Sequence, residues 1–268
     1  MTGLPPSAFT VLGATGYIGS RLVAHLQAQG HTVWAPARGD AEVFTRPLGH
    51  VIYCVGLTAD FRTRPFDTVD AHVGLLAEVL RRAQFDSLLY LSSTRVYMGA
   101  ADTHEDAPLA VLPGDPSYLY NLTKLTGESL CHASGRAEVR VARLSNVVGP
   151  DMDAASGNLV ADLLHQARQG HMVLRSDPQS AKDYVHVADV LDWLPRIALR
   201  GRSTVYNVAS GVQTPHAQWL EWLGTRYAST YEVQGGAPLQ RLAPINASRL
   251  HAEWGVVARS VWGDGTAL

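Results

Sequence analysis

Short apolar runs alternate with amphipathic stretches along most of this chain. The apolar runs predict strands at residues 9–12, 31–37, 51–55, 88–92, 139–144, 172–174 and 204–208. The amphipathic stretches predict helices between Gly19 and Gly30, near 66–83 and 118–134, and at about 158–169 and 215–228. Because strands and helices alternate, the pattern predicts an α/β fold with a doubly wound parallel sheet covered on both faces.

A glycine-rich turn joins the first predicted strand to the first predicted helix. Gly13 allows a tight turn, Gly16 lets the backbone approach a pyrophosphate, and Gly19 permits close helix–strand packing. The helix N-terminus adds free N–H groups and a positive dipole. The turn predicts a Rossmann-type dinucleotide site. The residues expected to bind the dinucleotide here are Gly13, Thr15, Gly16, Tyr17, Ile18 and Gly19.

The end of the second predicted strand bears on which dinucleotide binds. An NAD site usually has an acid there for the ribose 2′-OH, whereas this chain has Ala37 followed by Arg38. An arginine can pair with a 2′-phosphate, so the sequence favours NADP over NAD. Arg38 as a solvated loop charge is the alternative, and the nearby Asp40 keeps NAD open.

The connection between Arg38 and Val51 is unusually short. About a dozen extended residues span at most ~40 Å, enough to cross the sheet but too few for a helix, a strand and a second connection. We therefore expect the edge strand of the nucleotide half to be missing, or reduced to a stub around 42–45. The adenine side of the site would then be open.

This chain contains two lysines and twenty arginines. One of the lysines, Lys124, follows Tyr120 by four residues. On a helix that spacing puts both side chains on one face. A neighbouring ammonium favours the phenolate, so the pair suits proton transfer in carbonyl and alcohol chemistry. Ser92, Ser93 and Thr94 lie at the carboxyl end of a central strand, where ligands bind in this architecture. Chemistry alone does not show which of these three hydroxyls would hydrogen-bond the reacting oxygen.

Several motifs in a fixed order make the sequence resemble the extended short-chain dehydrogenase/reductase family of nucleotide-sugar epimerases, dehydratases and reductases. Besides the glycine turn, the motifs lie at residues 51–56, 91–97, 116–124, 143–150, 182–190 and 206–208. The resemblance implies an NAD(P)-dependent enzyme that acts on a nucleotide-sugar, and helices near 66–83 and 118–134 that pair in a homodimer.

The resemblance also implies roles for individual residues. Ser93 would be the catalytic hydroxyl and Tyr120 the acid/base, while Lys124 would bind the nicotinamide ribose and lower the pKa of the tyrosine. Tyr120, Lys124, Gly56 and Leu57 would complete the cofactor contacts. The residues expected to contact the substrate are Ser93, Thr94, Asn146, Asn158 and Lys182. For Lys182, a surface charge beside Asp183 is the alternative.

Some positions depart from that family. The 4,6-dehydratases of that family typically have Thr-Asp-Glu at the position where this chain has Ser93-Thr94-Arg95. The carboxylates needed for water elimination are therefore missing here. His72 stands where the family has a supporting asparagine, and it could relay protons or simply be a polar residue at the core. Arg62 and Arg64 lie in a segment that is better read as a solvated loop than as a phosphate contact.

Composition excludes several classes of function. A formal charge of −2 without a basic block argues against a nucleic-acid partner, and no apolar run is long enough to span a bilayer. Segment 1–7 lacks the features of a signal peptide, so we expect a cytoplasmic protein. Neither the eleven histidines nor the two cysteines show a metal-ligand spacing, and no metal is expected.

The expected protein has a dinucleotide-binding Rossmann domain and a small interleaved substrate lobe. The domain would comprise 1–150 plus 203–211, and the lobe 151–202 and 212–268. The expected reaction is hydride transfer at a sugar carbon, with reduction of a keto-sugar by NADPH favoured. A nucleotide-sugar epimerase that retains NAD is the alternative. A non-catalytic cofactor-sensing protein is less compatible with an intact set of Ser93, Tyr120 and Lys124.

Overall fold

The computed structural model describes residues 4–236, 239–240 and 242–262. Residues 1–3 of segment 1–7, and 237–238, 241 and 263–268 of the expected substrate lobe, lie outside the described residues. The chain divides into two compact units. The first unit comprises Met1–Val96, Val111–Leu144 and Val187–Val208, and the second comprises Tyr97–Ala110, Ser145–His186 and Ala209–Leu268. These boundaries differ from the expected ones, mainly because residues 187–202 belong to the sheet-bearing unit.

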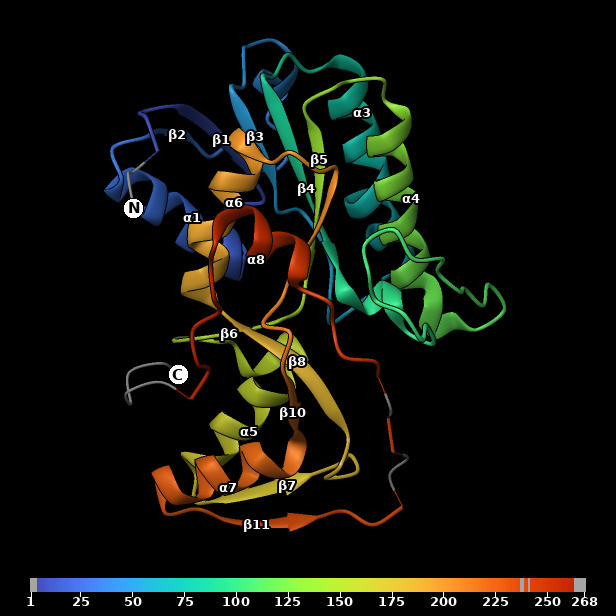
Figure 1. Cartoon of the computed structure of the whole chain (residues 1–268), viewed down its shortest axis with the longest axis vertical. Coiled ribbons are helices and arrows are strands. Elements are labelled where there is room, and N and C mark those ends of the chain that lie inside the picture. The colour runs from blue at the N-terminus through green and yellow to red at the C-terminus, as the bar shows by residue number, and fades with distance from the viewer. Residues whose placement is uncertain (1–3, 237–238, 241, 263–268) are drawn as a thin grey trace. The chain divides into compact units, whose positions relative to one another are not determined.

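A six-stranded parallel sheet forms the centre of the first unit, in the order β2-β1-β3-β4-β5-β9 (Figure 1). The predicted α/β fold with a parallel sheet is therefore confirmed. The strands are β1 (Ala8–Leu12), β2 (Thr32–Trp34), β3 (His50–Tyr53), β4 (Ser87–Ser93), β5 (Val139–Leu144) and β9 (Val205–Val208). Outside the edge strand β2, their side chains are almost all buried, as expected for strands covered on both faces.

Helices cover both faces of this sheet. Figure 1 shows α1 (Tyr17–Ala28) and α6 (Val187–Arg200) on one face, and α3 (Leu75–Arg82) and α4 (Leu119–Ala133) on the other. Two further elements precede α3, a short helix α2 (Pro65–Val69) and a π-helical turn Asp70–Gly74. Helix α6 was not predicted, although its buried positions recur every three or four residues; Pro195 lies inside it and weakens the usual helix signal.

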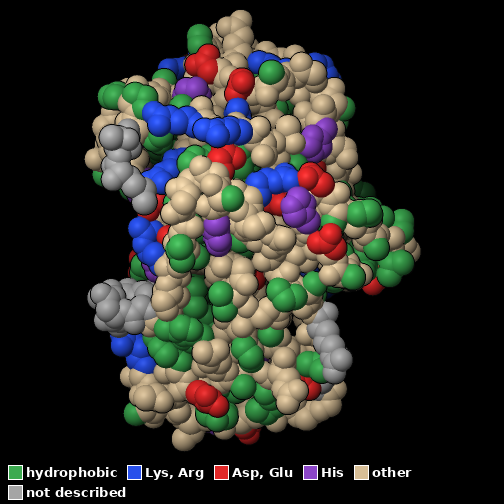
Figure 2. All heavy atoms as spheres, in the orientation of Figure 1, with side chains coloured by type: hydrophobic (Ala, Val, Ile, Leu, Met, Phe, Trp, Pro, Cys, Tyr) green, Lys and Arg blue, Asp and Glu red, His purple; other side chains and the backbone are tan. Residues whose placement is uncertain are grey.

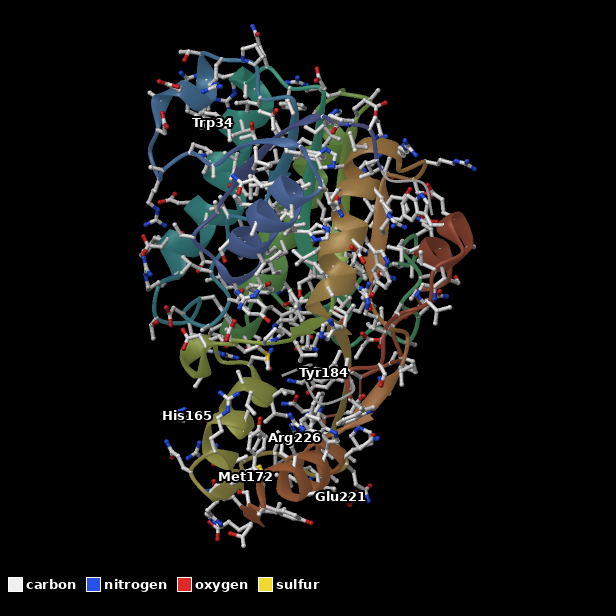
Figure 3. All side chains as sticks on the ribbon, turned by 90° about the vertical axis from the view of Figure 1, so that its left-hand side faces the viewer. Trp34, His165, Met172, Tyr184, Glu221 and Arg226 are labelled. Carbon is white, nitrogen blue, oxygen red and sulfur yellow. The ribbon has the colours of Figure 1, made fainter. Side chains whose placement is uncertain are left out.

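The edge strand expected to be missing between β2 and β3 is absent. Residues 35–49 are all described, and they contain only a 3-10 turn, Ala41–Phe44, and a single bridge from Pro47 to Gln84. Asp40 caps that turn by accepting a hydrogen bond from the Glu42 N–H at 2.9 Å. Strand β2 is therefore the edge of the sheet, and Trp34 stands at its end (Figure 3).

The described residues of the second unit form two small sheets and three helices. The strands are β6 (Asn146–Val148), β7 (His171–Leu174), β8 (Ala181–His186), β10 (Gln213–Pro215) and β11 (Thr230–Val233). They form the sheets β10-β8-β6 and β11-β7. Helices α5 (Leu159–Ala167) and α7 (His216–Tyr227) enclose a core that includes Met172 and Tyr184 (Figure 3), and α8 spans Ser248–Trp254.

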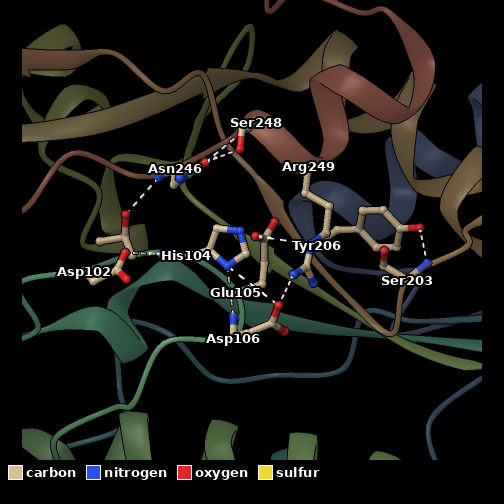
Figure 4. A network of polar contacts seen from close by, with 10 residues as sticks. Asp102, His104, Glu105, Asp106, Ser203, Tyr206, Asn246, Ser248 and Arg249 are labelled. Carbon is tan, nitrogen blue, oxygen red and sulfur yellow. Dashed lines mark hydrogen bonds and ion pairs between the residues drawn. The ribbon is translucent and has the colours of Figure 1, made fainter.

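Polar contacts fasten residues 97–110 to the C-terminal part of the second unit. The Thr103 hydroxyl donates to the Pro244 carbonyl at 2.6 Å and accepts from the Asn246 N–H at 2.9 Å. Arg249 forms an ion pair with Asp106 and lies 3.5 Å from the Glu105 carboxylate (Figure 4). These contacts explain why 97–110 belongs to this unit rather than to the Rossmann unit that flanks it in sequence.

None of the described helices is both long and apolar enough to cross a bilayer. On the face shown in Figure 2, acidic and basic side chains are interspersed. That distribution is consistent with the formal charge of −2.

Helix α4 lies unusually close to strand β4. A Cβ atom added at Gly127 would lie 2.5 Å from the Tyr90 hydroxyl, and the Tyr90 ring is fully buried. The adjacent Lys124 donates a hydrogen bond to the Leu91 carbonyl at 2.8 Å. A glycine is therefore required at this crossing, because any larger side chain would push the helix off the strand.

We expect Gly127→Ala to lower the free energy of unfolding by about 1–3 kcal/mol, as overpacking against a rigid buried ring does. Urea unfolding monitored by circular dichroism measures the change. Gly114→Ala is the matched control, since that glycine is exposed and an added Cβ would meet nothing within 4 Å. Equal stability of the two variants would contradict the tight crossing.

Candidate active site

The glycine turn has the geometry of a phosphate cradle. Gly13 has φ +84°, and a Cβ there would lie 2.8 Å from the backbone of Cys54 and Val55. Gly16 is the N-cap of α1, no side chain caps this end, and the first turn carries no acid. The N–H groups of the first turn are thus available to an anion. These features fit the pyrophosphate of a dinucleotide.

The end of β2 carries the residues expected to distinguish NADP from NAD. Arg38 is exposed, next to Gly39 with φ +81°. The Asp40 carboxylate is already used as the cap of the following 3-10 turn. Arg46 lies over the Trp34 ring at 4.3 Å. Asp40 therefore uses one carboxylate oxygen as a backbone cap, whereas Arg38 is accessible to a ligand.

The three hydroxyls at the end of β4 have different partners. The Ser92 hydroxyl donates to the Glu128 carboxylate at 2.5 Å, inside the core. Ser93, on the opposite face of the strand, acts on the Tyr120 side chain and lowers its pKa, and its hydroxyl accepts from the Arg95 backbone N–H at 3.2 Å. No contact of the Thr94 side chain is found among the described residues. The structure thus brings Ser93, rather than Ser92, to Tyr120.

Tyr120 is buried, and its hydroxyl has two hydroxyl partners, Ser93 and Thr58. Burial raises the pKa of Tyr120, while the hydrogen bonds from Ser93 and Thr58 and the positive charge of Arg95 lower it. The expected lowering by Lys124 is not found, since the Lys124 Nζ lies 5.9 Å from the Tyr120 ring centroid and donates elsewhere. Arg95 is the nearby charge that favours the phenolate.

Lys124 is buried, and its ammonium donates to the Leu91 carbonyl. Burial lowers the pKa of Lys124 to about 7, although Glu128 and Cys54 act to raise it. A Cβ at Gly56 would lie 3.4 Å from the Lys124 Nζ, so the end of β3 runs directly past the ammonium. Lys124 can therefore gain or lose a proton near neutral pH.

His72 is fully buried and links two segments of the first unit. Its Nε2 accepts from the Leu57 N–H at 3.2 Å, so in the neutral ring Nδ1 carries the proton and donates to the Thr123 hydroxyl at 2.8 Å. Burial and Lys124 lower the pKa of His72 to about 2, which keeps it neutral. Its ring meets the Tyr120 ring edge-on, with centroids 5.3 Å apart. This geometry corresponds to a polar residue at the core rather than to a proton relay through the Tyr120 hydroxyl.

A buried ion pair between Glu128 and Arg143 lies one helical turn from Lys124. Arg143 on β5 donates to both oxygens of the Glu128 carboxylate, the shortest bond being 2.7 Å. Glu128 also accepts from the Ser92 hydroxyl. Because Glu128 lies one turn after Lys124 on α4, the pair joins this helix to β4 and β5.

Three residues near Tyr120 were missed as site residues. Thr58 hydrogen-bonds the tyrosine, the buried Phe61 ring lies 5.6 Å from the Tyr120 ring, and Arg95 acts on it electrostatically. Arg62 lies over Phe61 at 4.5 Å, whereas Arg64 pairs with Asp67 at 2.7 Å. The sequence held no local signal for these contacts, because 57–64 is a loop whose position depends on residues far along the chain.

Asn146, Asn158 and Lys182 belong to the second unit. The Asn146 amide donates to the Asp183 carbonyl at 2.9 Å. Asn158 caps α5 by accepting from the Val160 N–H at 2.9 Å, and donates to the Val147 carbonyl at 3.2 Å. Both asparagines therefore have a structural use already. Lys182 lies on β8, paired with Thr214 of β10.

The described residues contain no group of three or more His, Cys, Asp or Glu side chains that could hold a metal ion.

A family model described as "NAD dependent epimerase/dehydratase family" matches residues 9–209 of the chain. The chain belongs to this family. It is therefore an enzyme of the NAD-dependent epimerase/dehydratase class. The resemblance inferred from the motifs is confirmed.

Individual relatives have low sequence identity to this chain. A UDP-glucuronic acid decarboxylase 1 of Danio rerio is 22% identical over 91% of this chain and 68% of its own length. A dTDP-4-dehydro-6-deoxy-D-allose reductase of Streptomyces sp is 24% identical over 76% of each chain. These relatives catalyse different reactions, so similarity to them does not select one.

Solved structures of similar fold cover nearly the whole chain. MoeE5 in complex with UDP-glucuronic acid and NAD has a TM-score of 0.78 at 21% identity, and covers 97% of this chain and 96% of its own. RMD from Pseudomonas aeruginosa with NADPH has a TM-score of 0.76 at 24% identity, and covers 94% and 95%. At these identities the likeness supports the fold.

The lowered pKa of Lys124 makes the stability of this epimerase-family protein depend on pH. An unfolded lysine stays protonated up to a pKa near 10.4, while the folded one loses its proton near 7. Between these values the unfolded state binds more protons, so the free energy of unfolding should rise with pH. We expect Lys124→Met to remove this rise between pH 7 and 9.5, measured by urea unfolding. Lys182→Met, which removes the other lysine, should keep it, and an unchanged slope in Lys124→Met would contradict the assignment.

Proposed function

We propose that this protein reduces the keto group of a nucleotide-linked keto-sugar with NADPH, using Tyr120 as the proton donor. The observation that carries the proposal is the interaction of Ser93 with the buried Tyr120, which lowers the pKa of the phenol, in the unit that also holds the phosphate turn. A pair of hydroxyls aimed at one point suits a carbonyl oxygen that becomes an alkoxide.

Bound NADPH would supply a hydride to the carbonyl carbon of the sugar. Ser93 and Tyr120 bind and orient the carbonyl oxygen, and the Tyr120 O–H gives its proton to that oxygen as negative charge develops on it. The product is an alcohol, and Tyr120 is left as a phenolate. The positive charge of Arg95 and the hydroxyl of Thr58 stabilise this phenolate until it regains a proton from water.

Lys124 and His72 organise the site around the tyrosine. The Lys124 ammonium is held by the Leu91 carbonyl, and we assign it to the nicotinamide ribose as the family resemblance implies. His72 holds the Leu57 N–H and the Thr123 hydroxyl from its two ring nitrogens, and Thr123 in turn donates to the Tyr120 carbonyl at 2.9 Å. This chain of bonds sets the distance between the loop after β3 and the turn that carries Tyr120.

NADP preference rests on the end of β2. Arg38 is exposed there, and Asp40, the acid that could have held a ribose 2′-OH, is occupied as a helix cap. Similarity to a keto-sugar reductase and to a protein solved with NADPH supports the same choice. An epimerase with retained NAD is the second candidate, supported by the similarity to MoeE5 with NAD. Ser93-Thr94-Arg95 lacks the carboxylates that dehydration would need.

The substrate contacts in the second unit belong to the same proposal. Asn146 and Asn158 would hold the nucleotide-sugar and Lys182 its phosphates. Thr94 would contact the sugar beside Ser93. We further propose a cytoplasmic homodimer that pairs through α3 and α4.

Tyr120→Phe should lower turnover at least a hundredfold, because general-acid catalysis contributes about 10²–10⁴ in rate. Turnover is measured as NADPH consumption with a panel of nucleotide keto-sugars. The dissociation constant of NADPH should change little, because only a hydroxyl is removed. Tyr118→Phe, a buried tyrosine two residues away, serves as control and should stay near the wild-type rate. Full activity in Tyr120→Phe would rule out its role as the acid.

Arg38→Ala should weaken NADPH binding roughly tenfold or more and leave NADH binding nearly unchanged, since only NADPH carries the 2′-phosphate. Fluorescence titration of both cofactors gives the two dissociation constants. Arg81→Ala removes an exposed arginine of α3 that pairs with Glu78, and should affect neither cofactor. Equal losses for NADPH and NADH in Arg38→Ala would remove the basis for the NADP preference.

A further inference from the structure

An arginine occupies the catalytic strand end where a carboxylate would serve dehydration. Arg95 follows Ser93 by two residues, and the backbone N–H of Arg95 donates to the Ser93 hydroxyl at 3.2 Å. Its positive charge acts on Tyr120 and lowers the pKa of the phenol. The guanidinium therefore lies beside the reacting centre, and the proposed reduction gives it no direct contact with the substrate.

The guanidinium of Arg95 is held in a fixed orientation. Its Nε donates to the Asn121 Oδ1 at 3.1 Å, and the Asn121 amide donates back to the Arg95 carbonyl at 3.0 Å. One Nη2 hydrogen donates to the Ser117 carbonyl at 3.3 Å. These bonds use two of the five N–H groups. Among the described residues the remaining ones have no partner, and Arg95 is only half-buried.

A second guanidinium shares an aromatic platform with the first. The Phe61 ring is 4% exposed, and it lies 4.5 Å from the Arg62 guanidinium, 5.5 Å from that of Arg95 and 5.6 Å from the Tyr120 ring. Arg62 is exposed and makes no hydrogen bond within the described part of the chain. Both cations and the catalytic tyrosine thus meet at one buried ring.

The corner formed by Arg95, Arg62 and Phe61 has an excess of positive charge. Burial is the main reason why the pKa of Arg95 lies below its usual value, and the positive charge of Arg62 lowers it further. The acid that acts on both arginines is Asp115, which is exposed and already accepts from the Ser117 N–H at 2.8 Å. Two guanidiniums therefore face one carboxylate that is in use as a cap, and an added anion would be stabilised by both.

We propose that Arg95 and Arg62 bind a carboxylate on the sugar ring of the substrate, next to the reacting carbonyl. The substrate class is then a nucleotide-linked uronic acid in its keto form. This inference rests on the proposed function, because it takes Tyr120 as the residue that contacts the reacting oxygen. A planar guanidinium with free N–H groups matches a carboxylate in a two-bond geometry, which a neutral hydroxymethyl group cannot form.

The chemistry of such a substrate agrees with a cation at this place. A carboxylate in the β position to a ketone is lost readily as neutral CO2, when the bonding electron pair moves toward the carbonyl. A guanidinium paired with the carboxylate stabilises the anion but not the CO2 that would form from it. The pair therefore favours hydride transfer with the carboxylate retained over decarboxylation.

The test compares two probes that differ only at the sugar C6, UDP-glucuronate and UDP-glucose. Their dissociation constants are measured by calorimetry on the full chain loaded with NADP. We expect the wild-type protein to bind UDP-glucuronate roughly tenfold or more tighter than UDP-glucose, because charge-assisted hydrogen bonds are strong in a half-buried site. Arg95→Gln should remove most of this preference by weakening UDP-glucuronate alone.

Further variants keep the test decisive if Arg95→Gln folds poorly. Arg95→Lys retains the charge without the fork and should restore part of the preference. Arg62→Gln changes an exposed residue and should reduce the preference severalfold. Arg64→Gln is the matched control in the same loop, because Arg64 pairs with Asp67 instead of stacking on Phe61, and it should leave the preference unchanged.

Two results would overturn the inference. One is a wild-type protein that does not bind UDP-glucuronate more tightly than UDP-glucose, including the case in which neither binds. The other is an equal loss of both probes in Arg62→Gln and Arg95→Gln. Failure of the proposed function is separate: a protein that prefers UDP-glucuronate in binding, yet consumes no NADPH with any keto-sugar, would support the carboxylate site and contradict the reductase.

Discussion

The contact between helix α4 and strand β4 is the constraint on which the rest of the active site depends. Lys124, Gly127 and Glu128 lie along one side of the helix. They meet the Leu91 carbonyl, the Tyr90 ring and the Ser92 hydroxyl in turn. This crossing sets the position of Tyr120, one turn earlier on α4, relative to Ser93 at the end of β4. The two hydroxyls meet because the backbone of one element is fixed against the other.

Burial has opposite consequences for the charges at this crossing. Glu128 is neutralised by bidentate pairing with Arg143, which is the geometry that makes a buried charge tolerable. Among the described residues the Lys124 ammonium donates to one carbonyl, that of Leu91, and burial lowers its pKa to about 7 although Glu128 and Cys54 act to raise it. Burying the Lys124 ammonium costs free energy, and it has N–H groups left over. Hydroxyl groups of a bound cofactor would accept from these N–H groups and stabilise the cation. The site therefore sacrifices stability where a cofactor is expected to bind.

The sequence predicted the parts of this molecule that depend on local pattern. The parallel sheet, the glycine turn and the missing edge strand follow from strand spacing and from the short connection before Val51. The contacts of Tyr120 were less predictable, because Thr58, Phe61 and Arg95 reach it from separate segments. The expected influence of Lys124 on the tyrosine was wrong for the same reason: a spacing of four shows a shared face, but not which acceptor the ammonium chooses. Helix α6 was missed because Pro195 interrupts its pattern, and β6 and β10 because each has three residues; β8 and β11 were missed as well.

In the proposed function, reaction type and substrate choice depend on different kinds of contact in the first unit. Ser93, Tyr120 and Lys124 are positioned by backbone carbonyls and by regular elements, so they tolerate little change. Arg62 and Phe61 come from the loop after β3, whose contacts with α4 are side chain to side chain. Such a loop can change its residues without moving the catalytic hydroxyls. In the proposed reduction, the same hydroxyl geometry can therefore be kept while the charge beside it changes, as Arg95 would illustrate if it binds the sugar carboxylate.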